Sequence, residues 1–314
     1  MSIVRESSLS VRNGLVLCLV TSVTCHVMST LSIAQAIVEA AQVLRRAGVP
    51  EARREAGSLL AHAIGRDRTF LITHADELLA PAEVGRYREF VERRAAGEPL
   101  QYITGRQEFY GLDFEVTPDV LIPRPETELL VETALDFLRE MNEPPLICDV
   151  GTGTGCIAIT LLHETTRARG VALDISPPAL YVAARNAARH NVGERLLLVA
   201  SDCFGAFNPS SARFSLIVSN PPYVAARALE GLQREVRDHE PRVALSPGAD
   251  GLAIIKRIVA DAPRFLNSGG HLLMEIGFDQ HEAVTSLIDQ NVWQLLDIHK
   301  DLQGIPRTVA LRKK

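Results

Sequence analysis

The sequence predicts an α/β protein in which a doubly wound, mostly parallel sheet follows a small helical bundle. Short apolar segments at 146–150, 171–174, 196–200 and 216–218 each lead into polar or glycine residues, as buried parallel strands do at their carboxyl ends. Residues 31–97 are instead rich in Ala, Leu, Arg and Glu and carry helical periodicity. The 314 residues suffice for one large α/β domain and a smaller one.

Composition and charge narrow the function classes. The chain is 46% hydrophobic and 23% charged, which is ordinary for a globular protein, and its formal net charge is −5. That charge argues against a broad, nonspecific grip on nucleic acid, which usually needs a basic face. The cysteines form no C-x-x-C pair and have no histidine at metal spacing, so we expect reduced thiols, no zinc and no disulfides (Cys18, Cys25, Cys148, Cys156 and Cys203).

Residues 1–27 are the irregular part of the chain. Arg5 and Arg12 precede an apolar run at 14–24 that is too short to span a membrane. The pattern resembles a signal peptide with a cleavage site at 34–36, but those residues fall inside a good helical pattern. We therefore interpret 1–27 as an over-long gene start or an unstructured extension, with organelle targeting or export as the alternative.

Deleting residues 1–27 should leave folding and activity intact, because the helical pattern begins only after Met28, with Ser29-Thr30 as capping residues. Soluble yield and turnover of the shortened chain check this. Loss of either would make the segment part of the fold.

The helical region, which we place at 28–98, divides into four or five short helices. Breaks fall at 48–50, 65–67 and 80–81, and one face of the first helix is apolar (Ile33, Ile37, Ala40, Ala41 and Leu44). Paired arginines are interpreted as solvated surface, with partner docking as the alternative (Arg45-Arg46, Arg53-Arg54 and Arg93-Arg94).

A linker at 99–123 comes next, and residues 102–116 within it predict a β-hairpin with Gly111 in the turn. The prolines on either side of Arg124 then hold the backbone extended, and Glu126 and Glu128 begin a helix, where the macrodipole favours carboxylates. A linker has no need of so rigid a turn. We therefore expect residues 122–128 to form a wall of the active site, and 124–314 to be the catalytic domain.

A nucleotide-type site is predicted where the strand at 146–150 opens into Gly151-Thr152-Gly153-Thr154-Gly155 and a helix follows. The glycines let a ligand approach the backbone, and the helix N-terminus offers free N–H groups. About twenty residues on, Asp174 ends the second strand, where a carboxylate can bind ribose hydroxyls. The alternative, that Asp174 caps the following helix, is weaker because Ser176 is the better cap. The third strand ends at Ser201-Asp202-Cys203, near the expected adenine.

The fourth strand stops abruptly at Asn220-Pro221-Pro222-Tyr223. Pro221 removes a backbone donor and keeps Asn220 out of the helical region, so a stiff turn follows the strand. A planar –NH2 group needs two acceptors in its plane and a flat surface beneath it. The Asn220 side-chain oxygen and the Pro221 carbonyl can be the acceptors, and Tyr223 the surface. The alternative is a proline-rich loop after a core strand.

From about Leu31 the chain resembles the peptide chain release factor N5-glutamine methyltransferases, the HemK family. Four stretches carry the resemblance: GEPLQYITG at 97–105, IPRPETE at 122–128, DVGTGTG at 149–155 and SNPPY at 219–223. The NPPY turn also occurs in DNA adenine methyltransferases, whereas the 122–128 stretch is far more specific. The resemblance implies a Rossmann-like, seven-stranded class I methyltransferase domain, S-adenosylmethionine as cofactor and class 1 release factors as partners.

The resemblance also implies roles for individual residues. Residues 151–155 would cradle the methionine part of the cofactor, Asp174 would hold the ribose, and Asp202 and Cys203 would border the adenine. Many relatives place a Trp at the Cys203 position, so Phe204 is an alternative stacking partner. Asn220, Pro221, Pro222 and Tyr223 would hold the substrate glutamine, with Asn220 also at the cofactor and Asn220, Pro221 and Tyr223 as the catalytic residues.

Downstream, residues 235–250 resemble the family's lid over the site. Gly269-Gly270 turn into a fifth strand at 271–277, and the resemblance would place a late strand, 309–311, antiparallel at the sheet edge. His239 and His271 are interpreted as structural, because nothing pairs them with a nucleophile.

Three functions remain open. The first is methylation of the glutamine in the Gly-Gly-Gln motif of class 1 release factors, implied by the resemblance, in a cytoplasmic monomer without membrane association. The second is adenine-N6 methylation of nucleic acid with the same turn on a flipped base, against which the acidic net charge weighs. The third is a non-catalytic binding module, against which the complete glycine loop weighs. An amide nitrogen is a poor nucleophile, so we expect catalysis by positioning and without a general base.

Overall fold

The structure, a computed structural model, describes residues 31–208 and 213–314. The expectations for residues 1–27, with Cys18 and Cys25, and for the cap at Ser29-Thr30 lie outside these ranges. Ser32 caps the first helix instead, in a capping box with Gln35.

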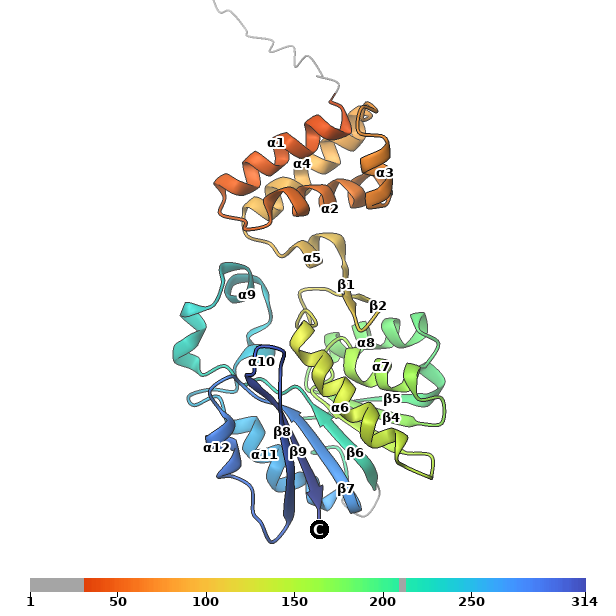
Figure 1. Cartoon of the computed structure of the whole chain (residues 1–314), viewed down its shortest axis with the longest axis vertical. Coiled ribbons are helices and arrows are strands. Elements are labelled where there is room, and N and C mark those ends of the chain that lie inside the picture. Colours follow the sequence, from red (N-terminus) through yellow and green to blue (C-terminus); the bar gives the residue numbers. More distant parts are fainter. Residues whose placement is uncertain (1–30, 209–212) are drawn as a thin grey trace, which may run out of the picture.

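A helical bundle forms the first part of the described chain, above the α/β part in Figure 1. The predicted breaks at 48–50, 65–67 and 80–81 are confirmed, because they separate α1 (Ile33–Arg46), α2 (Ala52–Ile64), α3 (Arg68–Thr73) and α4 (Pro81–Ala95). The apolar helix faces meet in a core of their own around Leu44, Leu59 and Leu60, none of which is exposed. The bundle therefore buries a separate hydrophobic cluster.

The β-hairpin in the linker is shorter than the predicted range, 102–116. Residues 102–104 belong to helix α5 (Leu100–Thr104), and the hairpin consists of β1 (Arg106–Phe109) and β2 (Leu112–Glu115) with Gly111 in the turn. The Tyr102 hydroxyl donates to the Val120 carbonyl at 2.6 Å and so joins α5 to the end of the linker. Phe109 and Phe114 are buried against the helices and sheet of the α/β part.

Within the described residues, the main sheet has seven strands in the order β5-β4-β3-β6-β7-β9-β8. The first five strands of that order are parallel, while β9 runs antiparallel to both its neighbours. The bounds are β3 (Leu146–Val150), β4 (Arg169–Asp174), β5 (Leu196–Ala200), β6 (Phe214–Ser219), β7 (Leu266–Glu275), β8 (Trp293–Lys300) and β9 (Pro306–Lys313). This confirms the predicted doubly wound α/β fold.

Two expectations for the last strands were wrong. The strand around 309–311 is antiparallel as expected, but it lies between β7 and β8 instead of at the edge. Val309, Ala310 and Leu311 are buried, which suits an inner strand, whereas β8 is largely exposed and forms the edge. Residues 269–270 lie inside β7, where the register with β6 shifts, and do not precede the strand.

Helices cover both faces of the sheet because its central strands are apolar on both sides. Leu216 and Val218 of β6 face a cluster with α6 (Glu128–Arg139) and α7 (Cys156–Glu164). Ile217 faces the opposite cluster with α11 (Ala253–Asp261). Further short elements complete the chain: η1 (Pro125–Thr127), α8 (Pro177–Arg189), η2 (Gly193–Arg195), η3 (Ala226–Gly231), α9 (Arg234–His239), α10 (Arg242–Leu245), η4 (Ala262–Arg264) and α12 (His281–Thr285).

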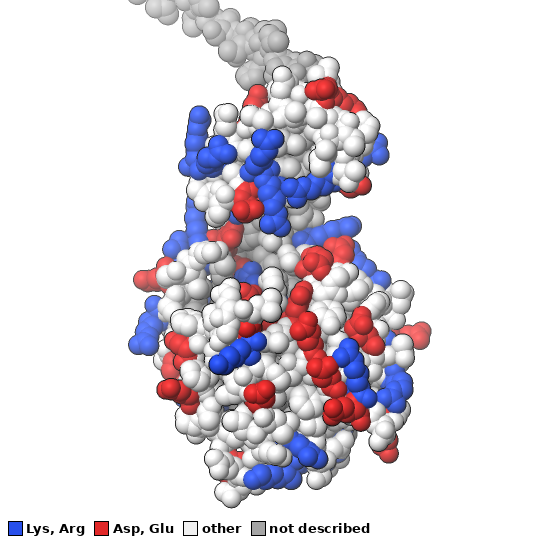
Figure 2. Space-filling model, viewed as in Figure 1, with Lys and Arg blue, Asp and Glu red and all other residues white. Residues whose placement is uncertain are grey.

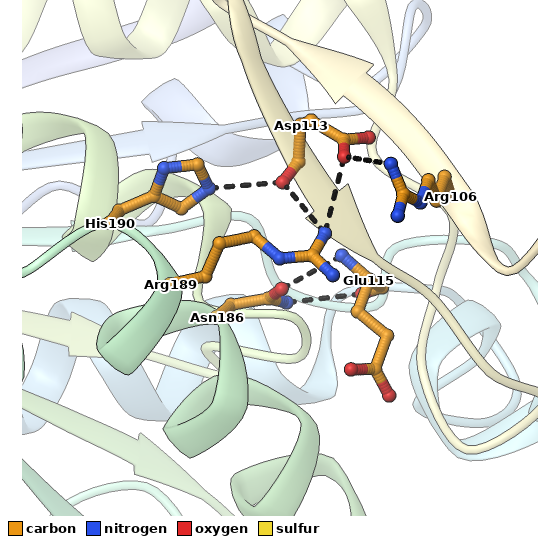
Figure 3. Close-up of polar contacts among 6 residues, drawn as sticks. All are labelled: Arg106, Asp113, Glu115, Asn186, Arg189 and His190. Carbon is orange, nitrogen blue, oxygen red and sulfur yellow. Dashed lines mark hydrogen bonds and ion pairs between the residues drawn. The ribbon is translucent and has the colours of Figure 1, made fainter.

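One side-chain amide joins the hairpin to the α/β part (Figure 3). Asn186 of α8 accepts from the Glu115 N–H at 2.8 Å and donates at 3.0 Å to the carbonyls of both Glu115 and Thr154. Asp113 adds contacts with Arg189 and His190 at the end of the same helix. The hairpin is thus joined to the loop that follows β3 through the Asn186 side chain.

The bundle is held from a second side by the segment that contains α9, which reaches toward it in Figure 1. Arg94 of α4 was expected on the solvated surface but is buried, because it pairs with Glu55 of α2 at 2.5 Å and with Glu235 of α9 at 2.7 Å. His271 was interpreted as structural. Its ring centroid lies 4.5 Å from that of Phe137, and burial lowers the pKa of its imidazole.

Candidate active site

A cavity of about 230 Å³ opens at the carboxyl ends of β3, β4 and β6, where the sheet order reverses. It brings together many of the residues singled out in the sequence: Gly151, Gly153, Asp174, Asp202, Cys203, Asn220, Pro221 and Pro222. Val243 and Ala244 of the segment expected as a lid also line it, as do residues to which the sequence analysis assigned no role, among them Val120, Leu121, Ile175 and Ile254. Thr152, Thr154, Gly155 and Tyr223 are not in the lining.

The glycine loop is shaped for close approach of a ligand. The Gly153 backbone has φ 55°, and a Cβ added there would meet no atom within 4 Å, so its open side faces space. Gly155 is different, because an added Cβ would lie 2.7 Å from Ile159 Cδ1. Gly153 thus leaves room for a ligand, whereas Gly155 makes room for the side chains of Ile159 in α7 and Ala183 in α8.

The two threonines of the loop brace it from within. The Thr152 hydroxyl donates to Asp149 Oδ2 at 2.6 Å, and the Thr154 carbonyl accepts from Asn186. Asp149 is fully buried, and this burial raises its pKa to about 7 despite the Thr152 hydrogen bond. These residues support the cavity from behind.

Asp174 lies at the end of β4 and faces the cavity. Its two oxygens accept from the N–H groups of Gly153 at 2.8 Å and Ser176 at 2.9 Å. Burial raises its pKa, and the backbone hydrogen bonds oppose that change. Ser176 caps α8 through the Ala179 N–H, as its sequence position predicts. The carboxylate keeps lone pairs for two hydroxyl donors.

At the end of the cavity beside Cys203, Phe204 does not take the position of the alternative stacking partner. Phe204 is buried and stacks on Phe265 with ring centroids 4.7 Å apart, so it is not available to a ligand in the cavity. Cys203, with φ 48°, turns the chain so that Phe204 enters the core. Apolar surface comes instead from Ile175, which is 56% exposed, and from Ile254.

The turn after β6 presents an amide at the cavity. Asn220 Nδ2 donates to Thr127 Oγ1 at 3.0 Å, and the Tyr223 hydroxyl donates to Glu275 Oε1 at 3.1 Å. Pro221 and Pro222 line the cavity beside Asn220. Asn220 thus lines the cavity and is held from behind by Thr127.

Comparison with known proteins identifies the family. A family model described as the PrmC N-terminal domain matches residues 35–105, and one described as the methyltransferase small domain matches 126–237. A release factor glutamine methyltransferase of Nitratidesulfovibrio vulgaris is 44% identical over 276 residues, which cover 87% of this chain and 92% of that protein. The chain belongs to the release factor glutamine methyltransferase family.

Other relatives agree. The release factor glutamine methyltransferase of Geobacter sulfurreducens is 45% identical over 269 residues, covering 86% of this chain and 92% of its own length. Among solved structures, the hMettl16 catalytic domain in complex with the MAT2A 3'UTR hairpin 6 has 16% identity and a TM-score of 0.53, covering 72% of this chain and 82% of that one. At that identity the likeness shows the fold alone.

This methyltransferase holds two buried glutamates behind the cavity lining: Glu275, to which the sequence analysis gave no role, and Glu240, which lies within the expected lid segment. Glu275, at the end of β7, accepts from Thr127 Oγ1 at 2.7 Å as well as from Tyr223, and burial raises its pKa to about 7. Glu240 pairs with Arg124 and accepts from the Ile122 N–H at 3.3 Å. A glutamate at a strand's carboxyl end was the available signal for Glu275.

The segment expected as a lid does border the cavity. Val243, Ala244, Ser246 and Pro247 line it, and Glu240 ties this segment to Arg124, whose backbone is extended as predicted.

In residues 31–208 and 213–314, no three His, Cys, Asp or Glu side chains are grouped to hold a metal ion. No helix in the same ranges combines the length and apolar character needed to cross a membrane.

Proposed function

We propose that this enzyme transfers a methyl group from S-adenosylmethionine to the side-chain nitrogen of the glutamine in the Gly-Gly-Gln motif of class 1 release factors. The carrying observation is Asn220, placed at the cavity with its Nδ2 committed to Thr127, so that its oxygen is left for a substrate amide. Family membership supplies the substrate class, since the relatives are named release factor glutamine methyltransferases.

The cavity residues fit the proposed cofactor. Gly151 and Gly153 leave open space beside the backbone, which suits the methionine part. Asp174 can accept from both ribose hydroxyls, and Ile175 and Ile254 offer apolar surface to a flat ring. When bound, S-adenosylmethionine supplies a methyl group activated by a sulfonium centre.

The chain's own residues then act by position. We assign Asn220 Oδ1 and the Pro221 carbonyl as acceptors for the two hydrogens of the substrate amide, which fixes the plane of that amide and the direction of its nitrogen. Orientation of this kind can contribute roughly 7–11 kcal/mol. The nitrogen becomes acidic once it carries the methyl group and loses its proton afterwards, so no general base is needed. Pro222 completes the wall, and Tyr223 holds the turn through Glu275.

Surface charge weighs against the adenine-N6 alternative. Acidic residues line the exposed side of α6, and Figure 2 shows an acidic stripe where Figure 1 places that helix (Glu132, Asp136 and the following Glu140). A phosphate backbone that lay along α6 would be repelled by this stripe.

The deciding experiment offers labelled S-adenosylmethionine with either a release factor or DNA. Label should appear on the Gly-Gly-Gln glutamine, and a release factor with that Gln replaced by Ala should accept none. Label on DNA adenine, with none on the release factor, would refute the proposal and leave only the fold and the cofactor.

Asp174→Ala should weaken binding of S-adenosylmethionine by about 1.5–3 kcal/mol, because charge-assisted hydrogen bonds to the ribose are lost. Calorimetric titration measures this. Ser176→Ala is the matched control, since it removes the neighbouring helix cap and leaves the carboxylate. Unchanged affinity in Asp174→Ala would reject the ribose assignment.

We also propose three functional parts: the bundle, 28–98, as the recognition module, the linker, 99–123, as a connector, and 124–314 as the catalytic domain. The separate hydrophobic cluster of the bundle supports the first division. A substrate from translation termination suits a cytoplasmic enzyme, and the expectation of a monomer is checked by sedimentation.

A further inference from the structure

The Asn220 side chain can present either of two atoms to the cavity. Its Oδ1 accepts hydrogen bonds and its Nδ2 donates them, although the two ends have nearly the same shape. A substrate amide nitrogen needs an acceptor, so the side chain works only with Oδ1 toward the substrate. Something in the protein must therefore exclude the rotated form.

A buried chain of hydrogen bonds leads away from this amide. Asn220 Nδ2 lies 3.0 Å from Thr127 Oγ1, and Thr127 Oγ1 lies 2.7 Å from Glu275 Oε2. The other Glu275 oxygen accepts from the Tyr223 hydroxyl at 3.1 Å. Thr127 is 2% exposed and Glu275 is 1% exposed, so water does not replace these partners.

The chemistry of these side chains determines which group donates and which accepts in each hydrogen bond. An ionised carboxylate only accepts, so the single hydroxyl hydrogen of Thr127 must point to Glu275. The Thr127 oxygen is then able only to accept from Asn220, and the atom that can donate to it is Nδ2. Turning the amide over would place two acceptors against each other in a buried site, which is costly.

We propose that Thr127 and Glu275 are positioning residues that determine which atom of the Asn220 amide faces the substrate. The proposal rests on the proposed function and assigns a task to two residues outside the NPPY turn. Neither residue is among those lining the cavity, so both act through Asn220.

The same hydrogen bonds make the orientation of the Asn220 amide depend on the protonation of Glu275. A protonated Glu275 can donate to Thr127, whose own hydrogen is then free to bond Asn220 Oδ1 in the rotated form. Thr127, Tyr223 and Arg307 favour the ionised form, while Glu126 and above all burial oppose it, and the pKa is raised to about 7. Since the ionised form is the active one, turnover should fall as the pH is lowered through about 7.

Two variants of Thr127 and a matched control test this chain of hydrogen bonds in the full-length enzyme. Thr127→Val keeps the shape and removes the hydroxyl, and should lower kcat by about tenfold or more while the Kd for S-adenosylmethionine stays unchanged. Thr127→Ser restores the hydroxyl and should recover most of kcat. Thr308→Val is the control, because Thr308 pairs with Glu275 in the sheet and its buried hydroxyl has no partner in the described part of the chain.

Glu275→Gln tests whether the ionisation of Glu275 causes the pH dependence of turnover. This variant should lose turnover and also lose the decline near pH 7, because its side chain no longer ionises. Asp149 is another buried carboxyl whose pKa is raised to about 7, so a decline that persists in Glu275→Gln belongs elsewhere and overturns the proton-sensitive part. If Glu275→Gln does not fold, the pH profile of Thr127→Val serves instead, and it should lack the same decline.

The outcomes separate this inference from the function on which it rests. A wild-type enzyme that leaves the release factor unlabelled refutes the proposed function. A wild-type enzyme that methylates it, together with Thr127→Val of equal kcat, refutes the positioning role. Equal losses in Thr127→Val and Thr308→Val would also refute it, because they would reflect only the loss of a buried hydroxyl.

Discussion

Asn220→Ala should lower turnover about a hundredfold or more, on the order of 3 kcal/mol, which is comparable to the loss of one oxyanion-hole donor. The variant removes an acceptor that orients the substrate amide, while the other residues assigned to the cofactor, Asp174 among them, remain. Affinity for S-adenosylmethionine, measured by calorimetry, should therefore stay near that of the wild type. Single-turnover rates with a release factor measure the loss.

Asn220→Asp is the matched control for shape. Its carboxylate still accepts, but it brings a negative charge near the buried Glu275 and cannot donate to Thr127. Turnover should be poor here as well. If either variant methylates the release factor at the wild-type rate, Asn220 does not orient the substrate.

Gly251→Ala should destabilise the protein by about 3 kcal/mol, roughly 1 kcal/mol from the left-handed backbone and the rest from overpacking. Gly251 has φ +73°, and an added Cβ would lie 2.3 Å from the Tyr223 carbonyl oxygen and 2.9 Å from Gln280 Nε2. That Nε2 donates to the same carbonyl at 3.0 Å. The methyl group would therefore displace the end of the NPPY turn, so turnover should fall together with stability.

Gly304→Ala separates the two causes. Gly304 has a similar φ of +79°, but no atom lies within 4 Å of an added Cβ. It should show only the backbone cost in urea unfolding, with turnover unchanged. Equal unfolding free energies for the two variants would show that the contact with Tyr223 carries no cost.

Most of the fold and part of the site could be predicted because their signals are local. The strand, glycine loop and helix at 146–164 are contiguous, and Asp174 and Asn220 each follow an apolar run. Parallel strands bring their carboxyl ends to one edge of a sheet, so three separate local patterns were enough to place these residues at one cavity.

The remainder depends on contacts between distant parts of the chain. Thr127 and Glu275 are 148 residues apart, and neither lies in a motif that names its partner. The apolar run at 309–311 indicates a strand, but its neighbours in the sheet are set by the path of β8, which no local pattern gives. Phe204 shows a related limit, because the turn at Cys203 decides on which side of the backbone its ring lies.

The hairpin determines where this protein could be cut and rejoined with a relative. Phe109 and Phe114 belong to the core of the α/β part, and Asn186 binds both Glu115 and the loop after β3. A chimera joined behind the hairpin would import foreign aromatic rings into that core and leave the Asn186 amide mismatched. A junction ahead of α5 keeps both intact. The exchangeable cassette is thus the four-helix segment, whose core must still accommodate Ile103 of α5, and the hairpin must be inherited together with α8.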